Sequence, residues 1–354
     1  MRDLLMPEIK TITPSDQSAW DSYVVSHEQG GPYLAYSWKK AVETAYGHKT
    51  VYLASYTGNT ISGVLPLVYI KPPFFSGRLV SLPFCDYGGI LAQNHETADA
   101  LLHHAKNLAA TIRAELEIRC PGSCPAIEKQ KGFIRVTNKS RMILELPGSA
   151  NRLWTGFKSK LRSQVKRPAK DGLVARIGGK NFKNEFYPVF SANMRDLGSP
   201  VHSGKWIDSV MDAFGEKARI GVVFKNGLPV AAGILLFYKN TATVPWASTL
   251  REYNHFSPNM LLYWSFLEYA SDSGYRLFDF GRSTPGEGTY AFKKQWGAMP
   301  TPLFWYRSGG GDIYPKNHAG KDGPWRQAAV RTWQRLPIVV TNAMGPCLRK
   351  YIDR

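Results

Sequence analysis

The chain has 354 residues, of which 44% are hydrophobic and 20% are charged. The length predicts two domains, and the composition is that of a globular protein and excludes a largely disordered one. Lys and Arg number 45 against 27 acidic residues, a formal net charge of +18, so we expect an anionic partner. The apolar stretches are shorter than a membrane span requires, and acidic residues near the N-terminus do not suit a secretory signal. We therefore expect a cytoplasmic protein.

The first 150 residues combine helical and strand patterns. Helices are expected over residues 15–26, from residue 36 onward and over residues 97–116. Strands are expected over residues 50–56, 60–70, 78–83, 115–119 and 141–146. Asp86 comes just before the paired Gly88 and Gly89, where the backbone can approach a ligand closely or turn sharply.

Half of the excess positive charge lies in residues 152–183, which hold ten Lys or Arg and one acidic residue. Apolar residues recur there every four positions, which predicts a helix with one apolar face, and we expect Pro168 to end it. The other faces carry basic residues, among them Arg162, Lys166 and Arg167. Because acidic partners at helical spacing are nearly absent, we interpret this surface as a contact for an anion. A solvated helix face is the alternative.

The second half predicts strands and helices in a defined order. Strands are expected over residues 173–177, 218–225, 228–238, 241–247, 275–280 and 302–306. Helices are expected over residues 181–195, 203–214 and 258–273, with a short one within residues 290–296. This is the order of the acetyltransferase-like (GNAT) α/β fold, and the first half has a similar outline.

We therefore expect an α/β protein with two acetyltransferase-like domains, residues 1–150 and 151–308, each a mixed and mostly antiparallel sheet with flanking helices. Two such units facing each other would leave a cleft, where ligand sites tend to lie.

Residues 309–354 are expected to form a Gly-rich linker and a basic tail. Residues 315–354 hold eight Lys or Arg and two acidic residues, with apolar residues between them. This pattern suits docking on the body of the protein or an anchor at a membrane interface. We expect docking, because Pro337 interrupts any long amphipathic helix.

The cysteines do not predict a metal site. Cys120 and Cys124 are close in the sequence CPGSC, but no neighbouring His or second Cys pair completes a zinc set. We interpret them as two thiols flanking a turn.

Several motifs resemble the FemAB family of peptidyl and aminoacyl transferases. The segment FDFGRSTPGEGTYAFKKQWG at residues 278–297 and the upstream MRDLG at residues 194–198 carry this resemblance. GVLPLVYIK at residues 63–71 and SLPFCDYGGIL at residues 81–91 are similar to the branch associated with exosortase (PEP-CTERM) exopolysaccharide systems. The resemblance covers residues 15–308.

This resemblance implies transfer of an aminoacyl group, from charged tRNA in the best understood members, to an amine on a peptidoglycan precursor. The acceptor here would be a cell-envelope or exopolysaccharide precursor, so the protein could lie peripheral to the inner membrane. The resemblance also implies that a Phe-Lys pair lies in the transfer channel, and Phe292 and Lys293 match it.

The chemistry of the reaction requires specific groups. Attack of an amine on an ester or thioester creates an oxyanion, and Lys293 is the candidate to stabilise it. A base must remove a proton, and Asp86 and Asp279 are the candidate carboxylates. Asp279 ranks lower, because its position in a strand also suits an ion pair with Arg282.

Further residues of the same segment are candidates for substrate binding. Arg282, after Gly281 at a strand end, suits a phosphate or carboxylate clamp, with the ion pair to Asp279 as the alternative. Gly281, Tyr290 and Trp296 complete this set, with Arg162, Lys166 and Arg167 of the basic helix.

Two other functions remain open. An acyl-CoA-dependent N-acyltransferase has the same fold, but residues 251–259 lack the glycines that let backbone amides approach the pyrophosphate. We therefore expect aminoacyl-tRNA rather than acyl-CoA as donor, and no bound cofactor. The second alternative is a non-catalytic basic module that binds RNA or an anionic membrane surface. For the transferase, the expected anionic partner is charged tRNA as donor or a lipid-linked or nucleotide-linked precursor.

Overall fold

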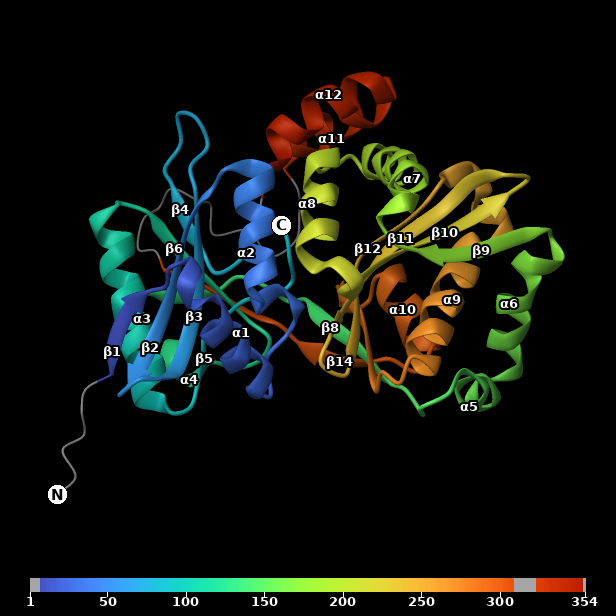
Figure 1. Cartoon of the computed structure of the whole chain (residues 1–354). Coiled ribbons are helices and arrows are strands. Elements are labelled where there is room, and N and C mark those ends of the chain that lie inside the picture. Colours follow the sequence, from blue (N-terminus) through green and yellow to red (C-terminus); the bar gives the residue numbers. More distant parts are fainter. Residues whose placement is uncertain (1–6, 309–322, 353–354) are drawn as a thin grey trace. The chain divides into compact units, whose positions relative to one another are not determined.

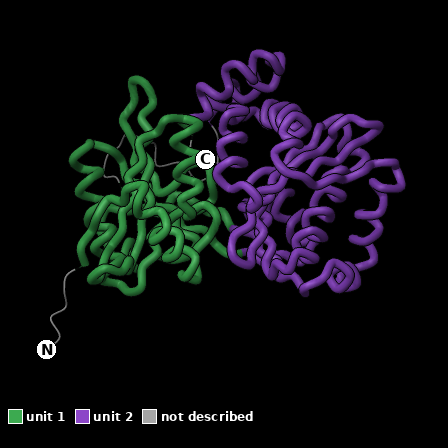
Figure 2. Tube along the Cα trace, viewed as in Figure 1, with its two compact units in different colours: residues 1–140, 301–321, 351–354 green, residues 141–300, 322–350 purple. Residues whose placement is uncertain are grey.

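The computed structural model describes residues 7–308 and 323–352, which divide into two compact units (Figure 2). Among these residues, the first unit contains 7–140, 301–308 and 351–352, and the second contains 141–300 and 323–350. This division differs from the expected one, which placed the boundary at residue 150, in the assignment of two strands. Strand β8 (Ser140–Glu145) joins the sheet of the second unit, and β15 (Phe304–Ser308) joins that of the first.

The first unit is built on a sheet with strand order β1-β2-β3-β4-β6-β15-β7, with β5 paired to β3. Its other strands are β1 (Glu8–Thr11), β2 (Lys49–Thr57), β3 (Thr60–Ile70), β4 (Arg78–Val80), β5 (Leu91–Ala92), β6 (Glu115–Cys120) and β7 (Phe133–Arg135). Its helices are α1 (Gln17–Ser26), α2 (Tyr36–Tyr46), α3 (His95–Thr111) and α4 (Pro125–Glu128). The β4–β6 pair is parallel, whereas β1–β2, β2–β3 and β3–β4 are antiparallel.

The second unit has a sheet with strand order β14-β8-β13-β12-β11-β10-β9. Its further strands are β9 (Leu173–Gly178), β10 (Ala218–Lys225), β11 (Leu228–Tyr238), β12 (Thr241–Thr249), β13 (Leu277–Ser283) and β14 (Met299–Pro302). Its helices are α5 (Ala150–Gly156), α6 (Ser159–Lys170), α7 (Lys183–Asp196), α8 (Gly204–Phe214), α9 (Pro258–Asp272), α10 (Gly288–Gln295), α11 (Pro324–Arg335) and α12 (Ile338–Arg349). Helices α5, α6 and α9 lie on one side of the sheet, and α7 and α8 lie on the other (Figure 1).

Helix α9 lies close to the sheet because two facing glycines make room for it. Gly221 of β10 pairs with Gly233 of β11, and the ring of Phe266 covers both. A Cβ atom on Gly221 would lie 2.2 Å from Phe266 Cε1. Buried apolar residues of α9, among them Met260, Leu262 and Leu267, belong to the same hydrophobic core, so the helix seals the core on this side of the sheet.

Strands β12 and β13 separate along their length. Within the described residues, their parallel pairing runs only from Thr241 to Thr243 on β12 and from Leu277 to Asp279 on β13. Both strands continue beyond this pairing, β12 to Thr249 and β13 to Ser283. These two strands lie in the middle of the sheet, and their separated ends leave space there for a site.

The prediction that Pro168 ends the basic helix, α6, is wrong. The helix continues to Lys170, with Pro168 in its last turn. A proline there removes a single backbone hydrogen bond. Its buried ring extends the apolar face of Leu161 and Val165, which offsets that loss.

The basic tail docks on its own unit, as expected. Gln334 Nε2 of α11 donates to the carbonyl of Asp196 at 2.9 Å, and Arg349 Nε of α12 donates to His202 Nε2 at 3.1 Å. Pro337 lies between the two helices and caps α12. The expected linker glycines at 309–311 lie outside the described residues. In the part of the chain that the structure describes, no helix combines the length and apolar character of a membrane span.

Candidate active site

A cavity of about 570 Å³ lies in the second unit, beside the separated ends of β12 and β13. It is lined by residues of α7, β12, α9, α10 and the turn that precedes α9: Asn193, Asp196, Leu197, Ala247, Ser248, Thr249, Arg251, Asn254, Asn259, Leu262, Tyr263, Gly288, Thr289, Phe292 and Lys293. Of the predicted site residues, the structure thus brings Phe292 and Lys293 together at this cavity.

Lys293 is a buried lysine on α10, with 8% of its surface exposed. Its Nζ donates to the carbonyl oxygens of Gly281 at 3.1 Å and Arg282 at 2.8 Å. Gly281 has a φ of 74°, a left-handed conformation that favours glycine, at the point where both carbonyls meet the ammonium group. The two backbone carbonyls therefore hold the Lys293 amino group in position at the cavity wall.

Phe292 contributes to an aromatic wall of the same cavity. Its ring meets the edge of Tyr263 with 5.1 Å between ring centroids, and Tyr263 stacks on Phe280 at 5.4 Å. Burial raises the pKa of Tyr263, so its hydroxyl stays protonated at neutral pH.

Asp279 does not line this cavity, and its role as a base stays a prediction. Its side chain is 1% exposed and is not among the lining residues. Arg141 Nε and Nη2 donate to its Oδ2 at 3.0 and 2.7 Å, and the N–H of Gly281 donates to its Oδ1 at 2.9 Å. Both oxygens are therefore engaged in structural bonds. The ion pair also differs from the expected one, since Asp279 binds Arg141 of β8.

Asp86 belongs to the first unit, whereas every cavity-lining residue belongs to the second. The Asp86 carbonyl accepts a hydrogen bond from Trp305 Nε1 at 2.9 Å, which ties this segment to β15. Its role as a base stays a prediction.

Trp296 lies in the core of the second unit, and its contact with substrate stays a prediction. It is 1% exposed and packs against Phe157, with 5.6 Å between ring centroids. Tyr290 packs partly against the same core. Arg282 is half-buried and joins the site through its carbonyl, and a clamp by its guanidinium group stays a prediction.

The predicted basic surface lies on α6, away from the cavity lining. Lys166 and Arg167 are exposed, and Arg162 is half-buried. Lys166 Nζ lies 5.5 Å from the centroid of the Trp154 ring, and Arg167 forms a 3.7 Å ion pair with Asp171. Contact of this helix with an anion stays a prediction.

The sequence analysis did not assign a role to the polar residues at the end of α7. Asp196 is the acidic residue among the described residues that line the cavity. Arg195 Nε and Nη2 hold its Oδ1 at 2.9 and 2.7 Å, and Asn193 Nδ2 donates to Ser248 Oγ at 3.1 Å. The available signal was the MRDLG motif, but nothing in the sequence placed it beside Lys293.

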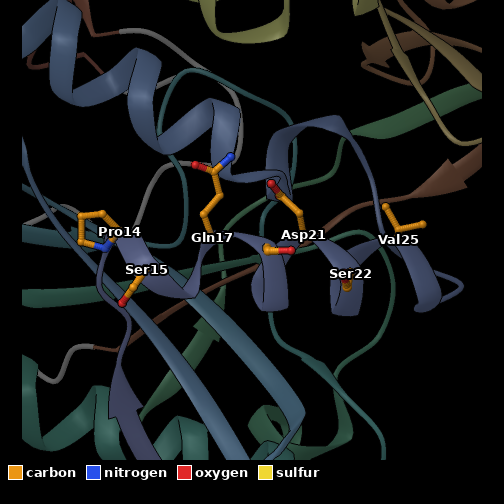
Figure 3. Close-up of a pocket in the computed structure, with 7 residues that line it drawn as sticks. Pro14, Ser15, Gln17, Asp21, Ser22 and Val25 are labelled. Atoms are coloured by element: carbon orange, nitrogen blue, oxygen red, sulfur yellow. The ribbon is translucent and has the colours of Figure 1, made fainter.

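Two other hollows lie in the first unit and offer less chemistry. One, of about 610 Å³, follows one side of α1, where Gln17 and Asp21 project together (Figure 3). Asp21 Oδ1 there accepts the N–H of Tyr36 at 2.8 Å. The other is lined partly by Cys120 and Cys124, which are both buried and not disulfide-bonded. Within residues 7–308 and 323–352, no three His, Cys, Asp or Glu side chains form a group suited to a metal.

Comparisons with known proteins identify the fold of the chain. A family model described as "Acetyltransferase (GNAT) domain" matches residues 157–294, a range that contains every cavity-lining residue. No curated protein matches the sequence.

Solved structures match over both units. FemX is 17% identical, with a TM-score of 0.67, and the match covers 85% of this chain and 96% of that one. The C-terminal domain of a putative lysylphosphatidylglycerol synthetase from Agrobacterium fabrum is 13% identical, with a TM-score of 0.56. This match covers 84% of this chain and 92% of that one. A tandem GNAT protein from the clavulanic acid biosynthesis pathway is 13% identical, with a TM-score of 0.58. This match covers 86% of this chain and 98% of that one. The protein therefore has the fold of tandem GNAT-like proteins, with a GNAT domain model matching its second unit.

Proposed function

We propose that the protein is a transferase that moves an aminoacyl or acyl group onto an amine, with the reaction in the cavity at Lys293. The amine nitrogen attacks the carbonyl carbon of an ester or thioester, the C–N bond forms, and the C–O or C–S bond breaks. The amine loses a proton, and the departing alcohol or thiol gains one. The observation that carries this proposal is the buried Lys293 ammonium group at the cavity wall. Its charge stabilises the oxyanion of the tetrahedral intermediate.

Asp196 is the carboxylate that suits the acceptor. It lines the same cavity, and Arg195 holds one of its oxygens in place. A carboxylate there attracts an acceptor ammonium group and takes up a proton as the neutral amine attacks. The sequence analysis considered Asp86 and Asp279 for this role, and Asp196 is a further candidate that the cavity lining adds.

The donor in this proposal is an aminoacyl ester, with aminoacyl-tRNA as the leading candidate. One structure of the same fold is named as a putative lysylphosphatidylglycerol synthetase, a name that refers to an aminoacyl product. The turn before α9, which ends at Ser257 with a φ of 54°, carries no glycine. The absence of glycine there argues against close approach of the backbone to the pyrophosphate of an acyl-CoA donor. The resemblance to the FemAB family favours an acceptor amine on a cell-envelope or exopolysaccharide precursor. An acyl-CoA donor is the second candidate, supported by the match to an acetyltransferase model.

Transfer assays with each donor test the proposal. The full chain is incubated separately with radiolabelled aminoacyl-tRNA and acyl-CoA, each with an amine-bearing envelope precursor. Lys293→Ala should lower kcat/KM about 100- to 1,000-fold. The matched control is Lys294→Ala, which removes the exposed neighbour on the same helix and should leave turnover unchanged.

Thermal unfolding of both variants separates catalysis from folding, and Lys293→Met serves if the alanine variant is unstable. A folded Lys293 variant with nearly normal turnover would overturn the assignment. Transfer from neither donor would instead favour the non-catalytic binding module. Asp196→Asn should lower kcat/KM and flatten its dependence on pH, which a structural role would not do.

A further inference from the structure

The connection between β3 and β4 presents two adjacent phenylalanines to solvent. Its sequence is KPPFFSG, residues 71–77, and Phe74 and Phe75 are 105% and 68% exposed. The connection projects beyond the neighbouring strands of the first unit (Figure 1). Large apolar side chains gain nothing for folding when they remain in water, so this tip points to a binding role.

The tip has a defined shape. Pro72 and Pro73 restrict the backbone, and the N–H of Phe75 donates to the carbonyl of Pro72 at 3.3 Å. At its base Gly77 lies against the Tyr69 ring, where an added Cβ would be 2.4 Å from the ring. The two phenyl groups are therefore held out on a stiff turn, which lowers the entropy lost when they bind.

Basic residues surround the base of this tip. Lys71 is exposed at its start, and the strand register places Lys49 opposite Tyr69. On the other side Arg78 pairs in register with Glu115, two residues after the exposed Arg113. The acidic residues here are themselves in contact with other groups: Glu115 lies 3.5 Å from Arg307, and Glu43 binds Lys39 and Thr50. The collar formed by Lys49, Lys71, Arg78 and Arg113 is thus positive.

We propose that Phe74 and Phe75 insert into the interface of an anionic lipid bilayer while this collar contacts the lipid phosphates. Aromatic rings favour the level of the headgroups, and each cation near an anionic surface adds to the attraction. A protruding pair of rings with cations behind it matches the layering of a membrane, with apolar groups inside and phosphates above them. This inference is independent of the proposed reaction and concerns only the first unit.

Vesicle flotation with the full chain tests the proposal. We expect binding to phosphatidylcholine vesicles that contain about one third phosphatidylglycerol, and much weaker binding without the anionic lipid. Phe74→Ser and Phe75→Ser should each weaken binding about tenfold. Lys49→Glu with Lys71→Glu should weaken binding to the anionic vesicles alone. The matched control is Leu228→Ser, which changes a residue 58% exposed at another hairpin and should have no effect.

Thermal unfolding should be the same for all these proteins, because the substituted side chains are exposed. The proposal is overturned if the serine variants bind vesicles as the unchanged chain does, or if that chain does not bind anionic vesicles. It is also overturned if the phenylalanines instead mediate self-association without lipid, which sedimentation velocity would show.

Discussion

Arg141 of β8 and Asp279 of β13 form a partly buried ion pair, in which Arg141 Nε and Nη2 both donate to Asp279 Oδ2 at 3.0 and 2.7 Å. The other oxygen of Asp279 accepts the N–H of Gly281, whose carbonyl in turn binds Lys293. The pair therefore fixes the end of β13 that orients the proposed catalytic ammonium group. Asp279 is thus connected to the site through this strand and is not among the residues that line the cavity.

Asp279→Asn should lower the free energy of unfolding by about 3 kcal/mol, because it leaves the partly buried charge of Arg141 uncompensated. Urea unfolding measures this change. The double variant Arg141→Met/Asp279→Leu should lose less than the sum of its two single changes. Normal stability of Asp279→Asn combined with lost turnover would instead restore Asp279 as a base.

His202 makes the stability of the second unit depend on pH. Burial and then the charge of Arg349 lower the pKa of His202 well below its usual value. The folded state therefore keeps this ring neutral while the unfolded state takes up a proton below about pH 6.5. Stability should be fully present above that pH and fall as the pH drops toward the folded-state pKa. Urea unfolding at about pH 8 and about pH 5 measures the difference.

Two variants identify the group responsible. His202→Gln should reduce the pH dependence, while His104→Gln, which changes an exposed histidine on α3, should leave it intact. An unchanged pH profile for His202→Gln would contradict the assignment. Because Arg349 is on α12, amide exchange of that helix should also increase at the lower pH.

Gly221→Ala tests the close packing of α9. The added methyl group would overlap the Phe266 ring, and overpacking of this kind costs about 1–3 kcal/mol. The control is Gly156→Ala at the end of α5, where an added Cβ meets no atom within 4 Å. Equal unfolding midpoints for both variants would show that the core accommodates the methyl group.

Helix α6 should bind a phosphate-rich partner with a measurable dependence on salt. If Arg162, Lys166 and Arg167 each contact a tRNA phosphate, the slope of log affinity against log salt should lose about 0.7 to 0.9 per substituted residue. Filter binding of tRNA to single and triple alanine variants measures this slope. Lys205→Ala, an exposed lysine on α8, is the control. A slope independent of these three residues would remove α6 from the binding surface.

Local patterns in the sequence were sufficient for most helices and strands. The turn at Asn226 and Gly227 joins β10 and β11 as expected, and the apolar run after Pro258 forms α9. The resemblance to the FemAB family, and not these local patterns, singled out Phe292 and Lys293, which both line the cavity. Turn preferences and apolar periodicity act over a few residues, so they can be seen without the rest of the chain.

The sequence by itself thus determined the type and order of the elements, the GNAT-like architecture and the Phe-Lys pair. Tertiary structure alone decided that β8 and β15 join the sheets they do, that Asp279 binds Arg141, and that Asp196 lies at the same cavity as Lys293. The residues of these contacts are far apart in the chain. Their pairing depends on which strand edges and buried charges meet once the whole core packs, and no local propensity records that.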